Sequence, residues 1–203
     1  MARTTIIAGV FVARIFSTMS CGAADEPAAY PAVKGERATR PAFDIDSTKA
    51  FRIELGRGGG FDGLDTVKLD RSGKVIMHRV KWEQRQTRHR KFRIRVWETV
   101  SLRVSEEDVA KILEAIKAKE LMNLDRAYHA DVADGTQWVF RIEQGGREKS
   151  VYFNNHFPAS IIQFAKKLDA IIAESGVNEL AWKAVPEDEH GQHDNALWES
   201  ISR

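Results

Sequence analysis

The sequence predicts an α+β fold, in which an antiparallel sheet of about six strands carries two helices packed on one face. Several segments alternate apolar and polar residues with the period of two that marks strands, and two later segments repeat apolar residues at helical spacing. Turn signals join most strands directly, without the regular strand–helix–strand alternation of a parallel sheet. The length of 203 residues and the 43% hydrophobic composition are typical of one globular domain with extensions.

The first two predicted strands flank a glycine-rich stretch. Apolar side chains alternate with charged ones over residues 51–55, and residues 64–69 continue as a second strand. Residues 70–73 have the composition of a turn. Two strands joined through glycines therefore begin the domain.

The next two strands are predicted to be long. Residues 74–82 form the third strand, and residues 92–104 form the fourth, whose apolar side chains share one parity. Glu98 is the single charged interruption of that apolar row. We therefore expect a bulge or kink near Trp97 and Glu98.

Two helices and a second hairpin follow. Ser105 is a preferred N-cap residue, and the three acidic residues after it favour a helix start. Residues 123–135 are polar and are expected to be a connection. The Gly-Gly pair at 145–146 is the strongest hairpin signal in the chain. A second helix is predicted to begin at Pro158 and to close at Gly176.

Composition divides the chain into four segments. Residues 1–21 read as an export signal, and residues 22–48 mix proline, alanine and charge as a flexible linker does. Residues 49–176 form the α+β binding domain. Residues 177–203 are expected to be a C-terminal tail, acidic near 187–189 and mainly disordered.

The predicted export signal resembles that of a bacterial lipoprotein. Arg3 precedes the apolar run 6–13, and the small Ser20 directly precedes Cys21, the single cysteine of the chain. We therefore expect an exported protein, either lipid-anchored through Cys21 in the cell envelope or free in the periplasm or outside the cell. The apolar run is too short to span a membrane, and one cysteine excludes an internal disulfide framework. The alternatives are a misassigned start codon and a disordered N-terminal tail.

Residues 56–64, GRGGGFDGL, are rich in glycine and lie between two predicted strands. The spacing of Gly58, Gly60 and Gly63 satisfies a dinucleotide-binding fingerprint, but that motif needs a helix directly after the loop. The companion motifs of a kinase glycine loop or a P-loop are absent. The glycines instead favour a wide turn, with Phe61 either buried over the sheet or projecting as an anchor.

The stretch GGFDG within this loop resembles a signature of the emfourin-like proteins, small bacterial proteins typified by an inhibitor of thermolysin-like (M4) metallopeptidases. The similarity covers about residues 50–175, including a serine-led helix start at 105–108 and an Asp-Gly pair at 134–135. The resemblance implies a compact α+β domain that inhibits a peptidase. The residues that it places near the partner-binding surface are Gly59, Gly60, Phe61, Asp62 and Gly63. Asp62, the long basic hairpin and the C-terminal tail depart from the family pattern.

A second candidate surface is the basic run at residues 79–95. Residues 85–91 are expected to be the tip of a hairpin, which would gather cations at one end. Such a patch could bind phosphates, anionic lipid, an anionic polymer or an acidic partner. Alternatively, it is a solvated edge that resists aggregation, or it pairs with the acidic residues 187–189. The patch residues are Arg85, Arg88, Arg90 and Lys91.

The sequence predicts a binding protein rather than an enzyme. No catalytic residue, metal site or cofactor motif stands out, because Cys21 lies in the signal region and the histidines are scattered. A formal net charge of +2 is too near balance to predict nucleic-acid binding. The leading hypothesis is an exported protein-binding domain, in its most specific form a metallopeptidase inhibitor. The alternative is an envelope-surface module whose basic hairpin binds anionic lipid or polymer; an enzyme of an unrecognised type is a third hypothesis.

Overall fold

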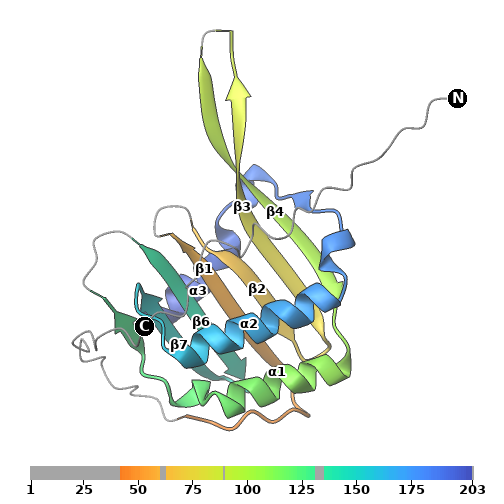
Figure 1. Ribbon diagram of the computed structural model, residues 1–203, viewed down its shortest axis with the longest axis vertical. Helices are drawn as coiled ribbons and strands as arrows, with labels where there is room; N and C mark the ends of the chain where they lie inside the picture. The colour runs from red at the N-terminus through yellow and green to blue at the C-terminus, as the bar shows by residue number, and fades with distance from the viewer. Residues whose placement is uncertain (1–41, 60–62, 89, 131–134, 203) are drawn as a thin grey trace, which may run out of the picture. The chain divides into compact units, whose positions relative to one another are not determined.

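Figure 1 shows the computed structural model, which describes residues 42–59, 63–88, 90–130 and 135–202. The predicted export signal with Cys21, and the loop residues Gly60, Phe61 and Asp62, lie outside the described residues. The described part of the chain has an α+β fold, as the sequence predicts.

A mixed sheet of eight strands, in the spatial order β5-β7-β6-β1-β2-β3-β4-β8, forms the centre of the domain. The strands are β1 (Phe51–Gly59), β2 (Asp65–Asp70), β3 (Lys74–Gln86), β4 (Lys91–Arg103), β5 (Ala127–His129), β6 (Thr136–Gln144), β7 (Arg147–Asn154) and β8 (Lys183–Ala184). Every neighbouring pair is antiparallel except β5 and β7, which are parallel. The structure therefore corrects the expected antiparallel sheet of about six strands, both in strand number and in polarity.

The two additional strands are very short and lie at opposite edges of the sheet. β5 has three residues and lies within the segment expected to be a polar connection, whereas β8 has two residues and lies in the expected C-terminal tail. Strands this short show no alternation in the sequence. Their strand conformation depends on the neighbouring strand that they pair with, because β-structure is set more by context than by intrinsic preference.

The turn between β6 and β7 confirms the strongest hairpin prediction. Gly145 and Gly146 have φ angles of +58° and +76°, and Gln144 pairs with Arg147 across the turn. Two consecutive positive φ angles are what the favoured two-residue hairpin turn requires, and glycine adopts them at the least cost.

The pairing of β3 with β4 contradicts the bulge expected near Trp97 and Glu98. The two strands pair one to one along their whole length, with Trp97 opposite Val80 and Glu98 opposite Arg79. The Nη2 atom of Arg79 lies 2.7 Å from a carboxylate oxygen of Glu98. Glu98 interrupts the apolar row because it has a charged cross-strand partner, not because the strand bends there.

Helices α1 (Glu106–Ala118) and α2 (Ala159–Glu174) cover the same face of the sheet, as predicted (Figure 1). The backbone N–H of Asp108 donates to the Ser105 hydroxyl oxygen at 3.1 Å, which confirms the predicted N-cap. Gly176 follows α2 with a φ of +80°, in agreement with the predicted helix end.

The main core lies between these helices and the sheet, and it extends to residues before the expected domain start at 49. Phe43 is 8% exposed and belongs to the core. The backbone N–H of Asp46 donates to the Gln144 side chain at 2.8 Å, and the Gln144 amide donates back to the Asp46 carbonyl oxygen. The part of the expected linker that the structure describes, residues 42–48, therefore packs as part of the domain.

The chain after Gly176 also packs against the sheet, which differs from the disordered tail expected there. Helix α3 (Gln192–Ser202) lies on the face opposite α1 and α2 (Figure 1). Leu197 of α3 is fully buried in a second apolar cluster with Leu64 and Val139. The single-turn 3-10 helices are η1 (Leu121–Asn123), η2 (Val177–Glu179) and η3 (Glu187–Glu189).

Candidate functional site

The predicted glycine loop is described only at its two ends. Gly59 is the exposed last residue of β1, and Gly63 has a φ of +81° next to Trp97. Asp65 opens β2, so a strand follows Gly63 where a dinucleotide site would need a helix. The structure therefore excludes the dinucleotide interpretation. Phe61, expected either to be buried over the sheet or to project as an anchor, lies outside the described residues.

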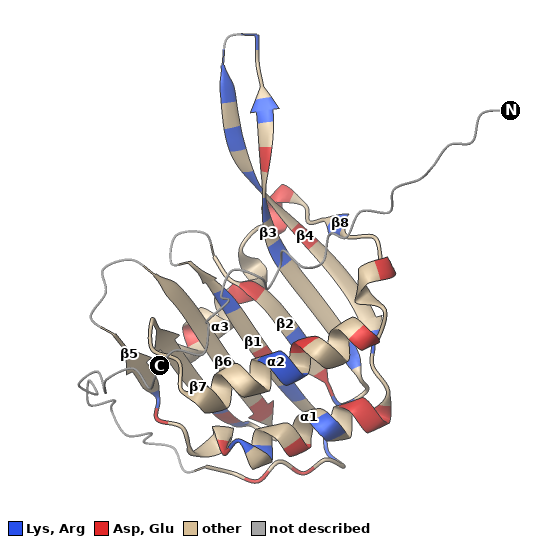
Figure 2. Ribbon diagram, in the orientation of Figure 1, with Lys and Arg blue, Asp and Glu red and all other residues tan. Residues whose placement is uncertain are grey.

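The basic run forms a hairpin that projects beyond the rest of the sheet, as Figures 1 and 2 show. β2 pairs with β3 only as far as His78, and β8 pairs with β4 only at Glu98 and Thr99. No third strand of the described chain pairs with residues 81–86 or 91–96. The distal half of the β3–β4 hairpin is therefore a two-stranded ribbon.

Positive charge is concentrated on this ribbon (Figure 2). Residues 81–95 hold seven Lys and Arg residues against the single carboxylate of Glu83, although the whole chain has a formal net charge of only +2. The ion pairs of the hairpin, within the described residues, join Arg79 and Lys81 to Glu98 and Lys81 to Glu83. None of these ion pairs involves the predicted patch residues, which are all exposed. These residues are Arg85, Arg88, Arg90 and Lys91.

Strand β4 presents two chemically different rows of side chains, since side chains alternate along a strand. On β4 the odd-numbered residues place three cations on one face, and the even-numbered residues place three apolar side chains on the other. The cationic row is Lys91, Arg93 and Arg95, and the apolar row is Phe92, Ile94 and Val96. On β3 the pattern is reversed, because the charged Lys81, Glu83 and Arg85 lie opposite Val96, Ile94 and Phe92. The alternation is visible in the sequence KFRIRV, but sequence reasoning treated the region as one basic patch.

Two large aromatic side chains are exposed on the ribbon. Trp82 is 45% exposed and Phe92 is 37% exposed. The Arg93 guanidinium lies 5.6 Å from the centroid of the Trp82 ring, within the range of a cation–π contact. Exposed tryptophan and arginine in contact are typical of residues that dominate protein interfaces.

The root of the hairpin is held from one face by charge pairs and an aromatic ring. The Arg79 side chain bonds the Glu98 carboxylate, with Nε at 2.8 Å from Oε2. The Arg79 guanidinium also lies 4.0 Å from the ring centroid of Trp182, just before β8. These contacts couple the C-terminal segment to the hairpin root.

An aspartate of β2 bonds the point where β3 leaves the sheet. The Asp65 carboxylate accepts a hydrogen bond from the Val80 backbone N–H at 2.7 Å, in the place where a β2 residue would otherwise pair. Burial raises the pKa of Asp65, against the lowering effects of this hydrogen bond and of the Arg57 and Arg79 charges. Val80 is the first β3 residue past His78 whose backbone N–H is directed toward β2, and the Asp65 carboxylate gives this N–H its hydrogen-bond acceptor.

The start of α3 holds the other face of the hairpin root. His193 is 7% exposed, and its ring stacks on His78 of β3 at 4.6 Å and meets the edge of Trp97 at 4.1 Å. The Asp194 carboxylate accepts hydrogen bonds from the Leu64 backbone N–H and from the Trp198 indole. Sequence reasoning missed the contacts of His193 with His78 and Trp97, and of Asp194 with Leu64, because they join residues more than 90 positions apart.

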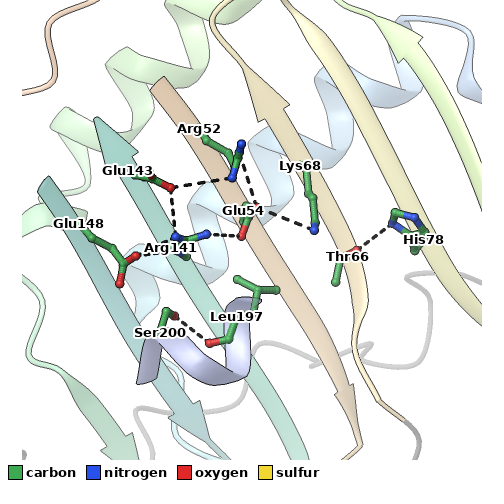
Figure 3. A network of polar contacts seen from close by, with 10 residues as sticks. All are labelled: Arg52, Glu54, Thr66, Lys68, His78, Arg141, Glu143, Glu148, Leu197 and Ser200. Carbon is green, nitrogen blue, oxygen red and sulfur yellow. Dashed lines mark hydrogen bonds and ion pairs between the residues drawn. The ribbon is translucent and has the colours of Figure 1, made fainter. Parts of the chain in front are cut away.

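A charged network lies on the same sheet face as α3 (Figure 3). Glu54 is 1% exposed, and its carboxylate lies 3.2 Å from Arg141 and 3.9 Å from both Lys68 and Arg52. The three cations compensate the buried carboxylate, whose charge would otherwise oppose folding. The network therefore has a structural explanation.

Other kinds of site receive less support from the described residues. They hold no group of three or more His, Cys, Asp or Glu side chains placed to bind a metal ion. No helix among them has the length and apolar character needed to cross a bilayer. A hollow of about 510 Å³ lies between residues 42–47 and α1, with both apolar and charged side chains in its wall.

The sequence matches a protein family of unknown function. No curated protein matches it. Residues 66–172, more than half of the chain, match the family described as a domain of unknown function, DUF6438. The matched range runs from β2 into α2 and includes the whole β3–β4 hairpin. The chain therefore belongs to the DUF6438 family.

Proposed function

We propose that this protein is a non-enzymatic binding domain that docks on an acidic partner protein through its β3–β4 hairpin. The observation that carries the proposal is the projecting ribbon, in which residues 81–95 include seven cationic side chains and one carboxylate. Cations gathered on a projecting element attract an acidic surface and speed its association. The four patch cations at the tip have no ion pair within the described residues, so a partner's carboxylates are free to bind them.

The side chains on the ribbon favour a protein partner. Arginine outnumbers lysine five to two between residues 81 and 95. Arginine and tryptophan are enriched at protein interfaces, where lysine is depleted, and the guanidinium fork matches carboxylate geometry. The contacts of Arg79, Asp65 and Trp97 at the root fix the direction of the ribbon, which lowers the conformational cost of binding.

A charge-matched pair of variants tests the proposal. The hairpin variant carries Arg85→Gln, Arg88→Gln, Arg90→Gln and Lys91→Gln. The control variant removes the same charge from exposed lysines elsewhere and carries Lys74→Gln, Lys117→Gln, Lys166→Gln and Lys167→Gln. Binding of poly-L-glutamate to the full chain is measured over a salt series, because screening weakens exposed charge pairs.

We expect the hairpin variant to lose most of the poly-L-glutamate binding and the control variant to retain it. Equal losses in both variants would contradict the proposal, since binding would then follow net charge alone. Vesicles with and without an anionic lipid provide a second comparison. Binding to anionic vesicles without binding to poly-L-glutamate would contradict an acidic protein partner. It would favour the alternative hypothesis, in which the hairpin binds anionic lipid of the envelope.

The resemblance at residues 59–63 supports a narrower form of the proposal, in which the partner is a thermolysin-like peptidase. An inhibitor acts through a rigid segment that enters the cleft without being cut. Titration of the purified protein against a thermolysin-like enzyme tests this form. Unchanged peptide hydrolysis at micromolar protein removes the peptidase and leaves the hairpin proposal standing.

We also propose that the protein works outside the cytoplasm, where a lipid on Cys21 holds it to the envelope. The lipoprotein-like sequence before Cys21 supports this location. Detergent partitioning of the expressed protein and of Cys21→Ser is the test. If Cys21 carries a lipid, the natural protein partitions into the detergent phase and Cys21→Ser partitions into the aqueous phase. The same partitioning of both proteins would contradict the lipid anchor.

A further inference from the structure

The outer edge of β4 already accepts a strand at the root of the hairpin. β8 pairs with β4 at Glu98 and Thr99, and the backbone N–H of Val185 donates to the Trp97 carbonyl oxygen at 2.8 Å. The Trp97 carbonyl therefore points away from β3. β8 has only two residues, so its pairing stops where the ribbon begins to project.

Beyond Trp97 the same edge continues without a paired strand in the described chain. Backbone direction alternates along a strand, so Arg93 and Lys91 direct their N–H and C=O groups to the same side as Trp97 does. No described strand pairs with the outer side of residues 91–94. An edge of this kind is a template for a further strand.

The side chains beside this edge define which strand fits. Side chains on adjacent strands project to the same faces, so an added strand sets alternate residues against Lys91 and Arg93 on one face and against Phe92 and Ile94 on the other. Acidic residues complement the cationic row, and apolar residues cover the apolar row. A second copy of β4 would bring like charges together, which disfavours pairing of the chain with itself.

We propose that the partner contributes an extended segment of alternating acidic and apolar residues, which adds as a strand to the outer edge of β4 next to β8. This inference rests on the proposed function, because it names how the hairpin binds its acidic partner. Main-chain hydrogen bonds hold the added strand, and the two side-chain rows select its sequence.

A pair of synthetic peptides tests the mode of binding. The first is a short capped peptide that alternates glutamate and valine. The second has the same sequence with N-methyl groups on alternate amides, which removes main-chain donors and keeps every charge. We expect the N-methylated peptide to bind the full-length protein about tenfold or more weakly, since two or more hydrogen bonds are lost.

A pair of protein variants tests the edge from the other side. Arg93→Gln and Arg93→Pro both remove the cation, but only proline removes the outward backbone donor. Proline is tolerated at edge positions whose N–H faces away from the neighbouring strand. We expect Arg93→Pro to bind the unmodified peptide more weakly than Arg93→Gln, with thermal melts showing that both variants fold.

The outcomes separate the inference from the proposal beneath it. Equal binding of the two peptides, lost only in the hairpin charge variant, overturns strand addition and leaves acidic docking intact. Binding of neither peptide, together with no binding of poly-L-glutamate, overturns both. If Arg93→Pro fails to fold, the peptide comparison with the natural chain still decides.

Discussion

At the residue scale, Gly59 at the end of β1 and Gly63 just before β2 have different environments. Gly63 has a φ of +81°, and a Cβ added there would lie 2.7 Å from the Trp97 ring, whereas nothing lies within 4 Å of a Cβ added to Gly59. We predict that Gly63→Ala lowers the free energy of unfolding by about 2–3 kcal/mol and Gly59→Ala by less than about 1 kcal/mol. Urea unfolding measures both, and equal losses would contradict the packing of Trp97 against Gly63.

Also at the residue scale, the histidines between β3 and α3 make stability depend on pH. Burial lowers the pKa of His78 to about 4, helped by the nearby charges of His193 and Lys68. Burial also lowers the pKa of His193, against the raising effects of Asp194 and the Leu64 carbonyl. In the unfolded chain both imidazoles titrate near the ordinary value of 6.5.

The direction of the pH effect follows from these lowered pKa values. Between pH 6.5 and 4 the unfolded chain binds more protons than the folded chain, so stability falls as the pH falls. Because His78 is only half-buried, we predict a loss of about 1–2 kcal/mol across this range. The free energy of unfolding at pH 6.5 and at pH 4 measures this loss, with His78→Gln as the comparison. An unchanged pH slope in that variant would show that His78 is not responsible.

At the element scale, α3 is the element whose contribution the sequence did not predict. Leu197 is fully buried against Leu64 and Val139, whereas Leu180, also in the expected tail, is 39% exposed. We predict that Leu197→Ala lowers the free energy of unfolding by about 2–4 kcal/mol, and that Leu180→Ala changes it by less than about 1 kcal/mol. Chemical denaturation of the two variants is the measurement. A near-zero effect at Leu197 would mean that α3 does not pack on the sheet in solution.

The elements predicted correctly are those with local signals. The Gly-Gly turn at 145–146, the N-cap at Ser105 and the helix stop at Gly176 each depend on a few neighbouring residues. β5, β8 and α3 are stabilised by segments far away in the chain, so their own residues do not predict that they form. The same holds for the candidate site. Its basic composition could be read from the sequence, but the ion pair of Glu98 with Arg79 could not be predicted without the register of β3 and β4.

At the scale of the whole molecule, charge is divided unevenly between the hairpin and the rest of the chain. Residues 81–95 have more positive charge than the net +2 of the chain, so the remainder is net negative. A basic projection on an otherwise acidic protein attracts an acidic partner to one place and repels it elsewhere. The packing of β8 and α3 at the hairpin root places this charge on a supported element.

The central claim is that the β3–β4 hairpin is the contact surface for an acidic partner. Backbone amide chemical shifts of the full chain, recorded as poly-L-glutamate is added, test it most directly. The account predicts that the changes concentrate in residues 81–96 and weaken as salt is raised. Changes concentrated on α1, on α2 or at the ends of the β1–β2 loop, with the hairpin unaffected, would contradict it.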